Sequence, residues 1–173
     1  MLSSRLLGNL AQMLGYDVKV SEVHGMAQRG GSVVTYIRFG EQVCSPLVEV
    51  GEADYIIAFE KLEALRWLPY LKKGGKMIVS AQEILPMPVI TGAAKYPDNS
   101  QDTLEAAGAL LVDAFTIAKE CGNEKAVNIV MMGILAKQLT YPKEQWVESI
   151  HQTVPQKVLD INLKAFDRGY GLV

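Results

Sequence analysis

Apolar residues at the start of the chain recur at spacings of three and four. Leu2, Leu6, Leu10 and Met13 would share one face of a helix with about 3.6 residues per turn. Gly15 follows them, and glycine is the residue that most often ends a helix in the left-handed conformation. The pattern predicts a first helix that ends near Gly15.

Two segments rich in β-branched residues come next and predict short strands, over residues 18–23 and 33–39. Gly40 and Glu41 then predict a turn into a third short strand around Val43. We therefore expect the chain's one clear hairpin on either side of this turn.

The middle of the chain alternates strand and helix patterns. Residues 53–59 form an apolar run typical of a buried parallel strand, and residues 76–80 predict another. Between them, leucines at every third position over 62–68 predict a helix, and residues 73–75 (Lys-Gly-Gly) predict a turn. Residues 109–113 are a short apolar run that fits a further strand. The strand–helix–strand order predicts a right-handed parallel crossover.

The last third of the chain is predicted to be mostly helical, after an irregular, proline-rich stretch from Pro86 to Pro97. The expected helices cover about residues 103–107, 115–121, 124–139, 143–152 and 155–169. The helix over 124–139 is apolar almost all round, so we expect it to be buried. The whole pattern predicts an α/β fold, a single Rossmann-like domain over residues 1–173 with a mostly parallel sheet, one hairpin and a helical C-terminal third.

The composition fits a soluble globular protein. Of 173 residues, 49% are apolar and 21% are charged, which argues against disorder. The formal net charge of −2 offers no basic face for nucleic acid or for an anionic membrane. The longest apolar stretch, Val127 to Ala136, has about half the length needed to cross a bilayer. We expect a cytoplasmic protein with neither nucleic-acid nor membrane partners.

The few cysteines and histidines predict no metal site. Cys44 and Cys121 are far apart in sequence and form no CxxC pair, whereas an iron–sulfur cluster normally takes four thiolates. His24 and His151 are the two histidines, too few for a multi-histidine site. Sparse, unpaired cysteines also suit a reducing cytosol.

The least ordinary segment is the polar loop HGMAQRGGS, which runs from His24 to Ser32 between two predicted strands. Its glycines would let a ligand or partner approach closely, and Arg29 could bind a phosphate or carboxylate through two parallel hydrogen bonds. A plain surface loop explains the same residues, and spacing alone slightly favours it because no nucleophile–base pair is visible. The candidate residues are His24, Gly25, Gln28, Arg29, Gly30, Gly31 and Ser32.

Other polar residues favour structural roles. Asn128 interrupts the apolar helix, where a buried amide either ties a neighbouring loop in place, the favoured role, or faces a ligand. Asn123, after Gly122, fits a cap or turn residue. An acid-rich stretch fits a solvated face better than it fits proton transfer. It comprises Glu49, Glu52, Asp54, Glu60 and Glu63. These residues alone indicate no reaction.

From Ser21 to Gly40 the sequence SEVHGMAQRGGSVVTYIRFG resembles the beta subunits of the indolepyruvate:ferredoxin oxidoreductases. More broadly, it is similar to the gamma domain of the pyruvate and 2-oxoacid:ferredoxin oxidoreductases. Ser45-Pro46-Leu47, Gly74-Gly75, GNEKAVNIVMMG and VPQKVLDINLKAFDRGY extend the resemblance over essentially the whole chain. The Arg-Gly-Gly loop and the Asn-bearing helix are specific when they occur together.

This resemblance implies the small subunit of an enzyme that converts indolepyruvate or a related 2-oxoacid, coenzyme A and oxidised ferredoxin into acyl-CoA, carbon dioxide and reduced ferredoxin. Thiamine diphosphate and the iron–sulfur clusters would belong to a larger alpha subunit, through which ferredoxin is reached. This chain would be inactive alone and would bind no cofactor by itself, with coenzyme A as a candidate ligand. The loop from His24 to Ser32 would face the partner or the substrate cavity, with Arg29 as an anion or interface contact and Asn123 and Asn128 in support.

One departure from the family pattern concerns the start of the chain. Members normally have a strand and a Gly-x-Gly-Gly-Gln-Gly loop before the first helix, and Met1 falls just after that point. Without that segment, an anion site at the helix N-terminus would be lost, and a sheet edge would be exposed for pairing with another chain, such as a second copy. Two other functions compete with the enzyme subunit. One is a free-standing binding or regulatory module, and the other is a nucleotide-dependent dehydrogenase, which the missing GxGxxG fingerprint disfavours.

Overall fold

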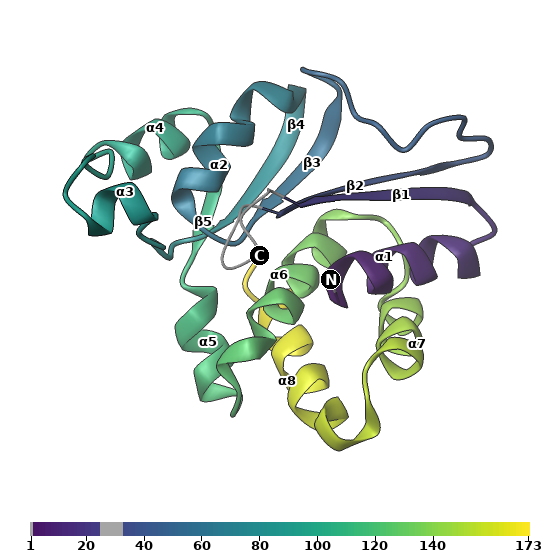
Figure 1. Ribbon diagram of the computed structural model, residues 1–173. Coiled ribbons are helices and arrows are strands. Elements are labelled where there is room, and N and C mark those ends of the chain that lie inside the picture. Colours follow the sequence, from purple (N-terminus) through teal and green to yellow (C-terminus); the bar gives the residue numbers. More distant parts are fainter. Residues whose placement is uncertain (1, 25–32) are drawn as a thin grey trace. The chain divides into compact units, whose positions relative to one another are not determined.

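The computed structural model describes residues 2–24 and 33–173. Contacts divide the chain into two compact units, whose helices and strands are labelled in Figure 1. The first combines Met1–Val48 with Ala118–Val173, and the second is Glu49–Ile117. The single domain over residues 1–173 stays a prediction. Within the described part of the chain, no helix combines the length and the hydrophobicity needed to span a membrane.

The first unit begins with the predicted helix, and Gly15 follows it with a φ of 83°. Its elements are α1 (Leu2–Met13), β1 (Asp17–His24), β2 (Val33–Gly40), η2 (Glu124–Ala126), α6 (Val127–Gln138), α7 (Lys143–Thr153), η3 (Gln156–Val158) and α8 (Leu159–Tyr170). The helix α5 (Ala114–Glu120) begins in the second unit and ends in the first. These helices confirm the predicted helical C-terminal third.

The hairpin is confirmed, but its strands are not the predicted pair. Strands β1 and β2 pair antiparallel along their full lengths, residues 17–24 against 33–40. The predicted strand around Val43 is wrong, because the chain after Gly40 has no strand until β3. There the backbone N–H of Val43 donates to Asp17 Oδ2 at 2.9 Å, and Arg38 Nη1 donates to the carbonyl oxygen of Leu47 at 3.1 Å. Side-chain hydrogen bonds, not a strand ladder, hold this segment.

Helices α6 and α8 pack with their backbones in close approach, side by side in Figure 1. A Cβ at Gly133 would overlap the carbonyl oxygen of Phe166, and a Cβ at Gly169 would overlap that of Val130. Glycine at these two positions is therefore a steric requirement of the crossing. The residues Ile129–Ala136 are all buried, which confirms the predicted buried helix.

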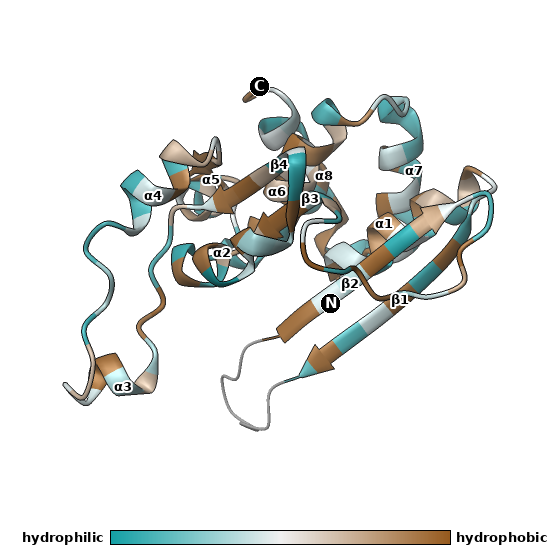
Figure 2. Cartoon of the chain, turned by 90° about the horizontal axis from the view of Figure 1, so that it is seen from above, coloured by the Kyte–Doolittle hydropathy of each residue, from teal (hydrophilic) through white to brown (hydrophobic). Residues whose placement is uncertain are grey.

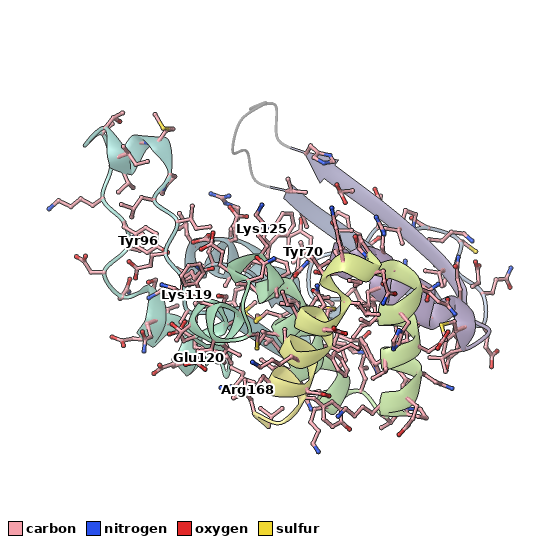
Figure 3. All side chains as sticks on the ribbon, turned by 90° about the horizontal axis from the view of Figure 1, so that it is seen from below. Tyr70, Tyr96, Lys119, Glu120, Lys125 and Arg168 are labelled. Carbon is pink, nitrogen blue, oxygen red and sulfur yellow. The ribbon has the colours of Figure 1, made fainter. Side chains whose placement is uncertain are left out.

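An ion pair joins the start and the end of this helical region. Arg168 Nη2 of α8 lies 3.0 Å from Glu120 Oε2 of α5, and both side chains are about half exposed (Figure 3). Because solvent screens such a pair, its contribution to stability is expected to be small.

The second unit holds three parallel strands in the order β3–β4–β5, and the parallel pairing of β3 with β4 confirms the predicted parallel strand–helix–strand arrangement. Its elements are β3 (Ala53–Ala58), α2 (Lys61–Trp67), η1 (Leu68–Tyr70), β4 (Leu71–Ser80), α3 (Met87–Ile90), α4 (Ser100–Ala106) and β5 (Leu110–Val112). The buried core of this unit consists of Ala58, Ala64, Met77, Val79 and Leu104. Parallel sheet, hairpin and C-terminal helices together confirm the predicted α/β class.

Strand β4 corrects a second prediction. It begins at Leu71, so Gly74 and Gly75 lie within a strand and not in the turn that their sequence suggested. The pairing register with β3 shifts between Ala53 and Tyr55, and a Cβ on Gly75 would lie 2.9 Å from the Ala53 carbonyl oxygen. Glycines inside strands commonly mark such irregular pairing and close backbone approach.

The proline-rich stretch after β4 is irregular, as predicted, apart from the single helical turn α3. Figure 2 shows α3 at the end of an excursion that leaves the parallel strands and returns to α4. From Glu83 to Lys95, no residue is buried. This excursion therefore lacks a core of its own.

Candidate functional site

The hairpin positions the candidate loop at its tip. His24 is the last residue of β1 and pairs with Val33, the first residue of β2. The antiparallel ladder thus fixes both ends of the segment between them. The other candidates in this loop lie outside the described residues: Gly25, Gln28, Arg29, Gly30, Gly31 and Ser32.

His24 has an acidic neighbour on its own strand. Its Nε2 atom lies 2.9 Å from Glu22 Oε1, and the histidine side chain is 63% exposed. Across the hairpin, Thr35 Oγ1 lies 3.5 Å from the other carboxylate oxygen of Glu22. Such an exposed pair is a weak stabiliser. The end of the hairpin ladder therefore carries an imidazole, a carboxylate and a threonine hydroxyl close together.

A groove of about 630 Å³ runs along the same hairpin, between α1, β1 and the end of α7. Its lining is Ser4, Arg5, Gly8, Asn9, Gln12, Val18, Val20, Glu22, Gln152 and Thr153. Arg5 Nη2 donates to the Thr153 carbonyl oxygen at 2.9 Å, and Asn9 Nδ2 donates to Gln152 Oε1 at 3.2 Å. The buried Asn9 Oδ1 has no hydrogen-bond partner among the described residues. Amide and guanidinium groups suit a polar ligand or a partner's backbone, but they supply no nucleophile.

The two asparagines named from the sequence have different surroundings. Asn123 caps η2, since its Oδ1 accepts from the Lys125 N–H at 3.0 Å, which is the cap that the sequence favoured. Asn128, in the first turn of α6, has a buried Oδ1 with no hydrogen-bond partner among the described residues. Burying an acceptor without a donor costs free energy, so the Asn128 side chain is a polar group in the first unit whose role these contacts do not explain.

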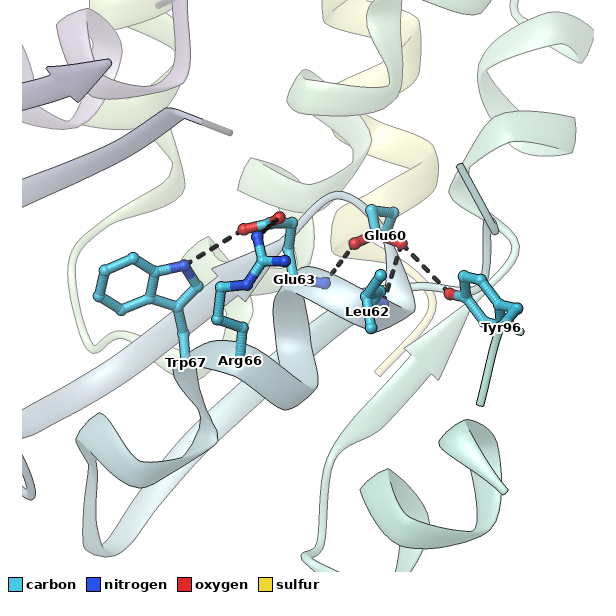
Figure 4. Close-up of polar contacts among 6 residues, drawn as sticks. All are labelled: Glu60, Leu62, Glu63, Arg66, Trp67 and Tyr96. Atoms are coloured by element: carbon cyan, nitrogen blue, oxygen red, sulfur yellow. Dashed lines mark hydrogen bonds and ion pairs between the residues drawn. The ribbon is translucent and has the colours of Figure 1, made fainter. Parts of the chain in front are cut away.

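The second unit gathers polar groups at the carboxyl ends of its parallel strands, which is where open α/β sheets commonly bind ligands. Glu60 follows β3 and is buried, so the prediction that it belongs to a solvated face is wrong. Its carboxylate caps α2 by accepting from the N–H groups of Leu62, at 2.9 Å, and Glu63 (Figure 4). An acid between a strand and a leucine-patterned helix is a cap signal that could have located it.

Tyr96 and Lys61 complete this cluster, and neither was a candidate from the sequence. Tyr96 donates its hydroxyl to Glu60 Oε2 at 3.3 Å. Burial, followed by the negative charge of Glu60, raises the pKa of Tyr96 to about 12. Lys61 Nζ lies 2.7 Å from Glu83 Oε1, and the lysine side chain is only 10% exposed. The cluster is thus a network of satisfied hydrogen bonds and ion pairs, whose first effect is to fix the segments that carry it.

The thiols and acids of the described residues form no metal-binding group of three or more. Cys44 is exposed and Cys121 is buried, so their sulfur atoms have different environments. This donor set does not fit an iron–sulfur cluster, which takes four cysteine thiolates.

Comparison with known proteins covers nearly the whole chain. The family model of the pyruvate ferredoxin/flavodoxin oxidoreductases matches residues 1–172. The indolepyruvate oxidoreductase subunits IorB of Thermococcus kodakarensis and Pyrococcus horikoshii are 42% and 43% identical, over 96% of this chain and 86% of each relative. These relatives confirm the resemblance that the sequence motifs indicated.

A solved structure confirms the fold. The gamma subunit of a keto/oxoacid ferredoxin oxidoreductase from Geobacter sulfurreducens superposes with a TM-score of 0.68 at 22% identity. The match covers 98% of this chain and 88% of that one. At this identity the likeness speaks for the architecture alone, so residue roles have to come from this chain.

Proposed function

The chain belongs to the pyruvate ferredoxin/flavodoxin oxidoreductase family, and on that basis we propose that it is the small subunit of an indolepyruvate:ferredoxin oxidoreductase. The observation that carries the proposal is the identity of 42–43% with two indolepyruvate oxidoreductase subunits IorB over 96% of the chain. The reaction is the coenzyme-A-dependent oxidative decarboxylation of an aryl 2-oxoacid, with ferredoxin as electron acceptor. The free-standing binding module is the outcome to be excluded by the test below.

In this proposal the cofactors lie on a larger, catalytic partner subunit in the cytoplasm. Thiamine diphosphate stabilises the carbanion left by decarboxylation, and iron–sulfur clusters pass electrons to ferredoxin. The two cysteines of this chain, one exposed and one buried, support placing the clusters on the partner. The activity therefore requires both subunits.

The part of this chain that we assign to the shared active site is the tip of the β1–β2 hairpin. The ladder from 17–24 to 33–40 holds the two ends of the loop at a fixed separation. Arg29 would contact an anion, either a phosphate of coenzyme A or a carboxylate of the partner, and Gly30 and Gly31 would allow close approach. The exposed His24–Glu22 pair at the end of the ladder offers such an interface a further polar contact.

The test is anaerobic co-expression with the larger subunit, followed by dye reduction that depends on indolepyruvate and coenzyme A. Arg29→Ala should lower kcat/KM by about tenfold or more, as expected for losing one charge-assisted hydrogen bond of about 1.5 kcal/mol or more. Arg168→Ala is the matched control, because its exposed ion pair with Glu120 is remote in sequence from the hairpin. Recovery of the chain alone, with no larger subunit and no activity, would contradict the subunit proposal and favour the free-standing module.

A further inference from the structure

The segment that follows β4 carries an unusual concentration of exposed apolar side chains. We define residues 84–95 as the α3 arm, which leaves the parallel strands and includes the helical turn α3 (Figure 2). Among the described residues, twelve large apolar side chains are exposed, and four of them lie inside this arm, between residues 84 and 90. They are Ile84, Leu85, Met87 and Ile90, with exposed fractions of 62, 47, 67 and 61%. Such clustering on a soluble protein usually marks an interaction surface.

The arm is preorganised by its own backbone. Ile90 N–H donates to the Pro86 carbonyl at 3.1 Å, and Thr91 N–H donates to the Met87 carbonyl at 2.9 Å. Beyond the helical turn, Ala94 N–H donates to the Pro88 carbonyl at 3.0 Å. The prolines fix φ at their positions, which lowers the conformational entropy that binding would otherwise remove. A surface ordered before binding is suited to docking.

Both ends of the arm are attached to the start of α2. Glu83, just before the arm, forms the 2.7 Å ion pair with Lys61. Tyr96, just after it, donates to Glu60 at 3.3 Å (Figure 4). Two adjacent residues thus hold the outgoing and the returning chain. Because Lys61 and Glu60 are buried, these attachments also fix where the arm leaves the parallel strands of the second unit.

The charge of the arm selects the kind of partner. Lys95 is the sole charged residue from 84 to 95. A transient partner such as an acidic electron carrier is usually matched by a cluster of opposite charges. An uncharged apolar surface is instead typical of permanent subunit contacts, whose buried centres are depleted of charge.

We propose that the α3 arm is a docking surface for the larger subunit of the oxidoreductase, with Met87 and Ile90 as its central apolar contacts. This inference rests on the proposed function, because it takes the larger subunit as a permanent partner. It also assigns the second unit a task of its own, separate from the hairpin tip that faces the active site.

The experiment measures the affinity between the purified chain and the larger subunit under anaerobic conditions. The double variant Met87→Asp/Ile90→Asp should weaken the complex by about 100-fold or more, since it places two charges where apolar contacts become desolvated. The control is Val50→Asp, which lies in the same unit, is 65% exposed and is outside the arm. It should bind within about twofold of the wild type, and all variants should retain the wild-type melting temperature because the altered side chains are exposed.

A second variant tests the ion pair that attaches the arm, without changing the apolar side chains of the arm. Glu83→Gln removes the charge that pairs with Lys61 and leaves the apolar side chains of the arm intact. It should weaken binding by about tenfold, less than the double variant, because only the preorganisation of the arm is reduced.

These measurements distinguish failure of the proposed function from failure of the proposed docking surface. If the wild-type chain binds no larger subunit, the proposed function fails and the docking surface fails with it. If the wild type binds and the double variant binds equally well, only the docking surface is overturned. If the double variant instead abolishes self-association of the isolated chain while leaving the larger subunit bound, the arm joins two copies of this chain, and the proposal is again overturned.

Discussion

The α6–α8 crossing and the α3 arm represent two opposite ways of holding a segment in place. In the crossing, two backbones approach so closely that Gly133 and Gly169 admit no side chain, and the helix α6 is buried over eight residues. In the arm, no residue from Glu83 to Lys95 is buried, and order comes from local hydrogen bonds and two polar attachments. Packing fixes the first segment, whereas a few polar contacts fix the second.

The difference teaches which changes each segment should tolerate. A closely packed crossing has no room to absorb an added atom, because protein interiors are as dense as organic crystals. An exposed arm can change its side chains freely without loss of stability, provided that its attachments remain. We therefore expect stability to depend on the crossing and binding to depend on the arm.

The largest effect on stability is expected from Gly169→Ala. In a helix, replacing glycine by alanine usually stabilises by up to about 1 kcal/mol, but here the new Cβ would overlap the Val130 carbonyl oxygen. The backbones of α6 and α8 would have to separate, so we expect a loss of about 3 kcal/mol or more in the free energy of unfolding. Urea denaturation measures this loss.

Gly171→Ala provides the matched control for this change. It follows α8 directly, and a Cβ there would meet its nearest neighbour, the Asp167 carbonyl oxygen, at 3.4 Å. Its free energy of unfolding should stay within about 0.5 kcal/mol of the wild type. Equal effects of the two substitutions would show that helix-end conformation, not the crossing, determines the response.

The sequence predicted the buried helix α6 better than the hairpin, for a physical reason. The run from Ile129 to Ala136 is apolar on every face, so burial follows from composition whatever the partner is. The hairpin required a choice between strands, and Gly40-Glu41 looked like the better turn. The pairing of β1 with β2 spans eight intervening residues, and the Asp17 hydrogen bond to Val43 replaces the expected strand. The pattern of apolar and polar residues over a few neighbouring positions predicts neither feature.

The place of the candidate loop was predictable in part. The sequence predicted a loop between two strands, but it put His24 in that loop, whereas His24 is the last residue of β1. The cluster of Glu60, Lys61 and Tyr96 was missed because Tyr96 lies 36 positions after Glu60 in the sequence. Acids near Glu60 are solvated, as with Asp54, so composition alone suggested that all of them are. Only the fold distinguishes the buried cap from its exposed neighbours.

A smaller effect is expected from Glu60→Ala, which tests the polar attachment of the arm. The substitution removes the acceptor for the N–H groups of Leu62 and Glu63 and for the Tyr96 hydroxyl. Loss of a helix cap costs about 1–2 kcal/mol, and chemical denaturation should detect a change of that size. The exposed Glu52 serves as control, since Glu52→Ala should change the free energy of unfolding by less than about 0.5 kcal/mol. A neutral result for Glu60→Ala would mean that water replaces the carboxylate.

The smallest effect at neutral pH is expected from Tyr96→Phe, and pH reveals it. The pKa of Tyr96 is raised from 10.0 to about 12 by burial and by the charge of Glu60, so the neutral phenol is favoured in the folded chain. A raised pKa gives a stability contribution that is complete below the unfolded value and is lost as the pH rises from about 10 to about 12. The ultraviolet titration curve is measured for the wild type and for Tyr96→Phe. The difference between the two curves should show one tyrosine ionising near pH 12. A midpoint near the ordinary value of about 10 would show that Tyr96 is not held against Glu60, and that the returning end of the arm is free.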